Sequence, residues 1–438
     1  MANQSLDSKK GESGNIKKLS IASNKSGQSD ISNGIVELRY YESILQETVR
    51  VQLQFVDTGN SVNGKTVIEG LPLVGTEKTK VIIEDNNKNE LSLDLYVNAV
   101  TPVQETTQQN LVNLSLVSKE HILNQRVRVN TRFDGKISDH VRKILTNANF
   151  LASSKDLDIE ETQNNYNFLA NNKKPFYTCT WLAKKGVPNI TSPGKTAGYF
   201  FYETSKGFNF RSIDKLLEQT PKRKLIFNET PDARGANIPF GYDGKILELE
   251  SDNNINVQSK DEIGAYSTRI VLFDPFNCKY QIIKPRLEET EKSLKLAGKE
   301  LPVFNSEFNS GRQDNFTRTT YMLIDRGSVP SGKTEDQINK SKEPNFDPKN
   351  ILNQSTMRYN QLFTIKKTIT IPGDFSLNAG DVIFVDIPEV SVDKKNQKPN
   401  SETGGLYIIA DLCHFVSTQY CLTKLNLVRD SYGRKTSA

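Results

Sequence analysis

The chain has 438 residues, more than one hydrophobic core usually organises, so we expect two to four domains. Hydrophobic residues make up only 36%, but 21 Phe and 15 Tyr are enough for several small β-rich cores, which excludes a wholly disordered chain. With a formal charge of +5, no strong polyanion-binding field follows from charge alone, and contact with nucleic acid is unsupported rather than excluded. The lack of a long apolar run or a signal peptide predicts a soluble protein made in a cytoplasm.

Residues 1–33 consist mainly of Ser, Lys, Gly, Asn and Asp, and they hold few apolar side chains. Such a segment cannot bury enough surface to offset its chain entropy. We therefore predict a flexible arm over residues 1–33.

Residues 34–118 contain five runs in which apolar and polar residues alternate with a period of two. Turns rich in Gly or Asn separate the runs, and this pattern is typical of half-buried antiparallel strands. It predicts a first small β-barrel that ends near Ser118. The five runs are Ile35–Tyr41, Val49–Val56, Lys80–Asp85, Leu91–Val97 and Leu111–Val117.

Residues 119–245 mix helical and strand patterns, which predicts an α+β connector domain. After Gly135, four apolar residues fall on one face at helical spacing, namely Ile137, Val141, Ile144 and Leu145.

The segment at 171–212 is the most distinctive part of the chain. The only tryptophan, Trp181, lies in a short run that stops at Gly186, as helices do. Two aromatic-rich runs follow, Gly198–Glu203 and Phe208–Arg211, and Gly207 stands at the turn between them. We predict a short helix followed by a β-hairpin.

Residues 246–432 return to strand patterns, interrupted by a polar stretch at about 290–350 that we interpret as an insertion. We predict a second β-barrel, discontinuous in sequence, and a short tail at 433–438. The fold class is therefore mainly β with an α+β middle portion. The expected strands are Ile246–Glu250, Ile255–Ser259, Ser267–Asp274, Tyr321–Asp325, Gln361–Gly373, Asp381–Pro388, Gly405–Val416 and Leu422–Asp430.

Two stretches carry sequence patterns that are found together in one protein family. The first combines a Trp-Leu-Ala helix, a Gly-Tyr-Phe-Phe-x-Glu-Thr strand and a Gly-Phe-x-Phe-Arg-Ser strand. Its positions are Trp181, Leu182, Ala183, Gly198, Tyr199, Phe200, Phe201, Glu203, Thr204, Gly207, Phe208, Phe210, Arg211 and Ser212. The second combines a Gly-Asp pair, a Gly-Leu-Tyr strand that leads to His, and a Thr-x-Leu-x-Leu strand. Its positions are Gly380, Asp381, Gly405, Leu406, Tyr407, His414, Thr423, Leu425 and Leu427.

With these patterns the chain resembles the central hub protein of contractile, T4-like phage baseplates, which is related to the hub part of type VI secretion spike proteins. The resemblance implies two tail-tube-like barrels per subunit and a homotrimer, whose six barrels adapt the sixfold tail tube to the threefold cell-puncturing spike. It implies a virion component assembled in the host cytoplasm, without catalysis, cofactor or metal. The implied partners are a trimeric spike, tail tube or tube-initiator proteins and baseplate wedge proteins. The hub of a non-phage contractile injection system remains an alternative.

On this interpretation the aromatic residues around Trp181 are core that fixes one barrel relative to the other. Substituting Trp181 should then damage folding or assembly.

A second alternative is a nucleotide-dependent enzyme, because Gly327–Thr334 matches the phosphate-loop pattern and would use Lys333 and Thr334. The preceding run Tyr321–Ile324 and the acid-ending run Val382–Asp386 would supply its strands. Against it, the ten residues after Thr334 hold one apolar side chain, and the chain shows β-meanders rather than βαβ units. Gly-Lys-Thr also recurs in polar turns at Gly64 and Gly194.

The remaining reactive side chains form no catalytic pattern. Cys179, Cys278, Cys413 and Cys421 lack paired spacing, so we expect reduced thiols rather than disulfides or a zinc site. His414 adjoins Cys413 on a strand, so their side chains face opposite sides, and a structural histidine is favoured. The other histidines, His121 and His140, stand in no general-base context.

Two basic clusters allow two interpretations. Lys222-Arg223-Lys224 and Lys366-Lys367 would ordinarily be solvated. They could instead line a channel through which DNA passes without base readout.

Overall fold

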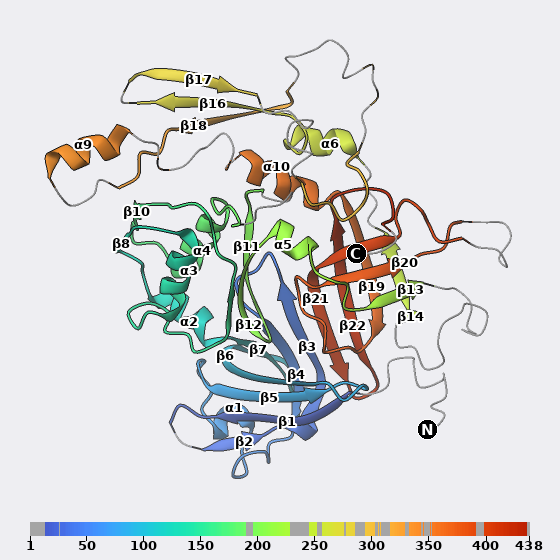
Figure 1. Ribbon diagram of the computed structural model, residues 1–438. Helices are drawn as coiled ribbons and strands as arrows, with labels where there is room; N and C mark the ends of the chain where they lie inside the picture. Colours follow the sequence, from blue (N-terminus) through green and yellow to red (C-terminus); the bar gives the residue numbers. More distant parts are fainter. Residues whose placement is uncertain are drawn as a thin grey trace.

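The computed structural model describes residues 14–25, 27–189, 196–227, 245–251, 256–275, 277–284, 294–302, 305, 307, 316–328, 333–342, 345, 351, 353–390 and 398–435. The architecture is mainly β with an α+β middle portion, as the sequence predicts (Figure 1). One sheet of 14 strands dominates it.

The first half of this sheet is built by the amino-terminal part of the chain. Its strand order is β3-β4-β7-β6-β5-β1-β2. All five strands expected between residues 34 and 118 are present, and the described pairings leave this half open between β2 and β3. The bounds are β1 Asn15–Ala22, β2 Gln28–Asp30, β3 Ile35–Ser43, β4 Arg50–Asp57, β5 Lys78–Glu84, β6 Glu90–Glu105 and β7 Asn110–Val117, with η2 Ser32–Gly34 and α1 Val67–Gly70 between strands.

The predicted flexible arm is wrong for its carboxyl-terminal part. Strand β1 pairs antiparallel with β5 from Asn15 to Ala22, and it buries Leu19 and Ile21 completely. Because a strand added to an existing edge gains backbone hydrogen bonds along its length, it needs few apolar side chains of its own. Residues 1–13 lie outside the described part of the chain.

The second half of the sheet closes on itself. β13 pairs with both β20 and β14, β15 pairs with β19, β19 with β22, β22 with β21, and β21 with β20. Only Leu247 separates β14 from β15, and its amide donates to the carbonyl of Thr370 at 2.8 Å, which completes the circle. The bounds are β13 Lys224–Phe227, β14 Lys245–Ile246, β15 Glu248–Ser251, β19 Ile365–Pro372, β20 Val382–Asp386, β21 Gly405–Ser417 and β22 Cys421–Arg429.

Strand β21 belongs to both halves and joins them. Its first residues pair with β20, whereas Asp411–Ser417 pairs antiparallel with Glu37–Ser43 of β3. One hydrophobic core runs beneath the junction, from Leu38 and Phe55 in the first half to Ile409 in the second. The two expected barrels are therefore halves of one hydrogen-bonded sheet.

The connector packs beside the sheet around a separate core (green in Figure 1). It contains the amphipathic helix expected after Gly135 and the helix and hairpin expected at 171–212. The hairpin runs from Tyr199↔Ser212 to Thr204↔Gly207. The bounds are α2 Lys119–Arg126, β8 Arg132–Phe133, α3 Ile137–Thr146, β9 Leu157–Ile159, β10 Phe168–Leu169, α4 Pro175–Ala183, β11 Tyr199–Thr204, β12 Gly207–Ser212 and α5 Ile213–Leu217.

A three-stranded sheet, β17-β16-β18, projects from the body (yellow, top of Figure 1). Two expectations are wrong here. The run Ser267–Asp274 forms β16 of this sheet rather than a strand of the second half, and residues after Asn256 form a helix that the Asn256 side chain caps. The bounds are α6 Val257–Glu262, β16 Thr268–Asp274, β17 Lys279–Ile283, β18 Arg318–Leu323, α9 Thr334–Lys342 and α10 Asn353–Leu362. No described helix is long and apolar enough to cross a bilayer.

Candidate functional site

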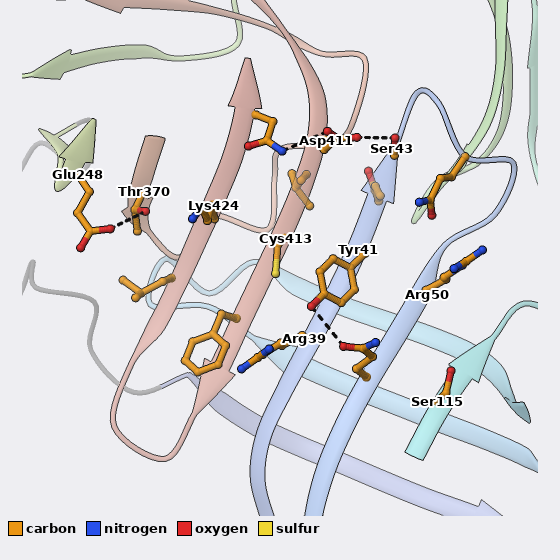
Figure 2. Close-up of a pocket in the computed structure, with 17 residues that line it drawn as sticks. Arg39, Tyr41, Ser43, Arg50, Ser115, Glu248, Thr370, Asp411, Cys413 and Lys424 are labelled. Carbon is orange, nitrogen blue, oxygen red and sulfur yellow. Dashed lines mark hydrogen bonds between the residues drawn. The ribbon is translucent and has the colours of Figure 1, made fainter. Parts of the chain in front are cut away.

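A groove of about 830 Å³ crosses the outer face of the continuous sheet where its halves join (Figure 2). Alternation along each strand places most side chains that line the groove opposite the apolar core, whereas Glu42 lies on the core face of β3. Basic and acidic groups balance, because the groove is lined by Arg39, Arg50, Lys424, Glu42, Glu248 and Asp411. A balanced polar surface favours contact with protein or hydrated solute over tight binding of a polyanion.

The acids of the groove are already engaged within the protein. The Ser43 hydroxyl donates to Asp411 at 2.5 Å, and the Thr370 hydroxyl donates to Glu248 at 3.1 Å. Burial raises the pKa of the Cys413 thiol in the same groove, so this thiol is protonated and unreactive at neutral pH. Among the described residues no group of three or more His, Cys, Asp or Glu could hold a metal ion.

Beneath the groove, buried Glu42 ties three segments together. Its carboxylate accepts from the Tyr40 hydroxyl at 2.6 Å, from the amide of Ser205 at 2.7 Å and from the amide of Ala379 at 2.8 Å. The side-chain amide of Asn378 donates to it at 3.1 Å. β3, the β11–β12 turn and the loop before β20 thus meet at one carboxylate, and we call the region where they meet the joint. Burial raises the pKa of the Glu42 carboxylate.

A second buried carboxylate, Glu203 of β11, lies at the same joint. It pairs with Lys155, which also pairs with Glu120 at 2.9 Å, and it accepts from the amide of Val49 at 3.2 Å. Burial outweighs these partners and raises the pKa of Glu203 to about 7.

A further buried ion pair connects the connector, helix α10 and the end of β22. Arg358 donates to Asp430 at 2.6 Å and lies 3.7 Å from Asp214. The Thr196 amide and hydroxyl donate to Asp214 at 2.9 and 2.5 Å. Separating a buried charge from its partner costs much free energy. These contacts therefore hold the connector, helix α10 and β22 in one relative position.

The aromatic hairpin buries both of its faces. Tyr199 and Phe201 enter the connector core, where Tyr199 stacks on Phe210 with ring centroids 4.6 Å apart. Phe200 and Tyr202 enter a different cluster, shared with the second half of the sheet. The hairpin therefore lies between the two cores.

Trp181 lies at the edge of the connector core, half-buried on α4. Its ring meets those of Tyr166 and Phe168 edge-on at 5.4 and 5.2 Å, and the Lys185 ammonium lies 4.8 Å from its centroid.

All four glycines of the two family patterns have positive φ angles. A Cβ on Gly207 would lie 2.2 Å from the carbonyl oxygen of Asp156, and one on Gly380 would lie 2.1 Å from the Tyr202 hydroxyl. Gly405 leads into β21 with φ of 128° and a hypothetical Cβ 3.4 Å from Arg429. Gly207 and Gly380 permit contacts that any larger residue would block.

Other residues of the two family patterns also make defined contacts. Arg211 pairs with Asp158, and the fully buried Tyr407 donates its hydroxyl to the carbonyl of Thr403 at 2.6 Å. His414 lies 2.9 Å from the Thr423 hydroxyl, and burial lowers its pKa to about 3. It is a neutral core histidine, while Cys413 faces the groove.

The phosphate-loop pattern Gly327–Thr334 does not have the surroundings of a nucleotide site. The amide of Gly327 donates to Asp325 at 2.7 Å and that of Ser328 to the carbonyl of Asn167 at 3.3 Å. Strand β18 before it and strand β20, the would-be magnesium strand, lie in different sheets. Helix α9 follows on the surface, and residues 329–332 lie outside the described part.

The triplet at 222–224 is paired with acids. Lys222 pairs with Asp381 at 2.5 Å, Arg223 with Asp374 at 2.9 Å, and Lys224 with Asp386 at 3.5 Å. In the other pair Lys366 is exposed, whereas Lys367 is buried and donates to Ser251 at 3.0 Å. This pairing weakens the channel-lining interpretation of both clusters.

Sequence reasoning missed the buried acids of the joint. For Glu42 a signal exists, because Leu38, Tyr40 and Glu42 share one face of β3 and an acid there interrupts an apolar row. For Asp214 and Asp430 no comparable signal is present, since their partner Arg358 is far away in sequence.

Comparisons with known proteins identify the fold. No protein-family model and no curated protein matches the chain. A 43 kDa tail protein of prophage MuSo2 from Shewanella oneidensis superposes with a TM-score of 0.51 at 9% identity, covering 94% of this chain and 98% of that one. A tail protein from Neisseria meningitidis gives 0.49 at 9% identity, covering 94% and 96%. An E. coli component of the type VI secretion system gives 0.43 at 9% identity, covering 92% and 76%. The chain thus has the fold of a phage tail protein over almost its whole length.

Proposed function

We propose that this chain is a structural subunit of a contractile phage tail, the central hub of its baseplate, and that it carries out no catalysis. The observation that supports this most is the continuous sheet, in which β21 joins two half-sheets edge to edge. In a ring of three subunits, six such halves would present a sixfold arrangement to a tail tube, while the subunits keep threefold symmetry toward a spike.

The geometry of the joint supports this role. A hub that transmits force between tube and spike must hold its two half-sheets in one relative position. Glu42, Glu203 and the Arg358–Asp430 pair link the connector to both halves through buried polar contacts. The partners we propose are a trimeric spike on one face, tube or tube-initiator proteins on the other, and wedge proteins around the ring. DNA would pass without base readout.

Electron microscopy of the purified protein bound to its spike tests this function. Class averages along the axis should show a ring with threefold symmetry and six lobes. An asymmetric particle, or a ring whose lobes number three, would contradict the symmetry-adapting role. In the virion, antibodies against the chain should label the baseplate.

A further inference from the structure

The outer face of the projecting β17-β16-β18 sheet carries large apolar side chains that are exposed in the described part of the chain. Pairing places Ile282, Val271 and Tyr321 in one row across the three strands, and Tyr280, Phe273 and Leu323 in the next. Because side chains alternate along each strand, all six lie on the same side of the sheet. We call these six residues the arm face.

The opposite side of the same sheet carries a small cluster of buried apolar side chains. Ile270, Leu272 and Ile283 are buried there, with Met322 and Ile324 packed against them. The sheet is therefore apolar on both sides, although one covered side would suffice for an ordinary surface sheet.

Exposure on the arm face is unusually large for apolar side chains. Tyr321 is 75% exposed, Tyr280 72%, Leu323 66%, Ile282 48% and Phe273 38%. With about 200 Å² for each aromatic side chain, these residues expose on the order of 500 Å². That is as large as the largest patch on a typical monomer and more than half of what one partner buries in a standard interface, about 800 Å².

We propose that the arm face is a subunit interface whose occupant is a second copy of this chain. None of the six residues is charged, and the charged Arg269 borders them on the same side of β16. An apolar centre with a polar rim is the composition of an interface between subunits. A flat apolar sheet left open promotes aggregation, so its cover must be present from synthesis onward, and another copy meets that condition.

The position of the sheet favours a head-to-tail contact. It projects away from the body, so it reaches a neighbour rather than its own chain (Figure 1). In the ring of three that the proposed function requires, and on which this inference rests, each arm would cover a different surface of the next subunit, and the contact would close.

The test compares two double variants of the whole protein by sedimentation velocity. Tyr280→Lys/Tyr321→Lys introduces two charges on the arm face, at side chains so exposed that the core loses no packing. Val74→Lys/Val103→Lys is the matched control, since these valines are 83% and 52% exposed, in the loop before β5 and in β6 respectively. We expect a trimer for wild type and control, and a folded monomer, with the circular dichroism spectrum of the wild type, for the arm variant.

The outcomes separate the inference from the proposed function. A trimeric arm variant overturns the arm face as a subunit contact and leaves the hub intact; if that variant also fails to bind the spike, the face belongs to the spike. A wild type that stays monomeric with the spike present contradicts the hub itself. Should the lysine variant unfold, Tyr280→Ser/Tyr321→Ser removes apolar area without adding charge. For this variant we expect a trimer dissociation constant at least tenfold higher than that of the wild type.

Discussion

At the residue scale, glycines allow the connector to approach its neighbours closely. Gly207 has φ of +133°, and a Cβ added there would meet the backbone of Asp156, just before β9. Alanine there combines an unfavourable backbone conformation with a backbone clash that no side-chain rotation relieves.

We expect Gly207→Ala to lower the free energy of unfolding by about 3 kcal/mol or more. Gly135→Ala is the matched control, because Gly135 has φ of +114° with nothing within 4 Å of the added Cβ, and it should cost only the backbone term, about 1–2 kcal/mol. Urea unfolding followed by Trp181 fluorescence measures both. Equal losses would show that Asp156 moves aside.

His414 should make stability fall in acid. Its pKa is lowered to about 3 in the folded chain, from an ordinary value of 6.5, because burial disfavours the charged ring. The neutral ring thus favours the folded state above pH 6.5, and this contribution is lost as the pH falls from 6.5 toward 3.

Wild type and His414→Gln should therefore respond differently to pH. Between pH 7.5 and pH 5 we expect the wild type to lose about 2 kcal/mol more than the variant, in urea unfolding at both values. A stability difference that stays constant over this interval would show that His414 is not held neutral.

At the element scale, the aromatic hairpin and helix α4 position the connector. The hairpin contributes Tyr199 and Phe201 to one core and Phe200 and Tyr202 to another. Because both faces are buried, a change in the packing of α4 against the connector core acts on the hairpin as well.

Trp181→Ala should reduce stability by about 2–3 kcal/mol, less than for a fully buried tryptophan because Trp181 is half-buried. Tyr177→Ala on the same helix, whose side chain is 55% exposed, serves as control and should change stability by less than about 1 kcal/mol. Thermal melting followed by circular dichroism compares them. Equal melting temperatures for the two variants would exclude Trp181 from the core.

Elements with clear periodicity could be predicted, and those that depend on distant partners could not. Strands β3, β4, β5, β6 and β7 and the hairpin follow from alternation and turn glycines. The sharing of β21 between two half-sheets depends on pairing with β3, more than 350 residues earlier in the chain, which no local pattern specifies. β16 looks like any half-buried strand, so its sequence does not indicate which sheet it joins.

Some residues of the candidate site could likewise be predicted from local patterns, and others could not. The neutral role of His414 and the burial of the hairpin aromatics follow from local patterns. The buried ion pair Arg358–Asp430 brings together residues 72 positions apart in surroundings that only the folded chain creates. In sequence, both residues look like ordinary surface charges.

At the scale of the whole molecule, the continuous sheet sets the two halves at one relative position. A chain with two independent barrels could vary the angle between them, whereas pairing along Asp411–Ser417 and Glu37–Ser43 prevents this. In the proposed ring of three subunits, a rigid pair of half-sheets would keep the six halves at fixed positions.

The mass of the protein in solution tests the hub assignment most directly. Sedimentation velocity of the wild-type chain, alone and with the spike protein of the same particle, should show a species of about 148 kDa, three times the 49.3 kDa of one chain, before the spike adds its own mass. A chain that stays at about 49 kDa under both conditions would contradict the account.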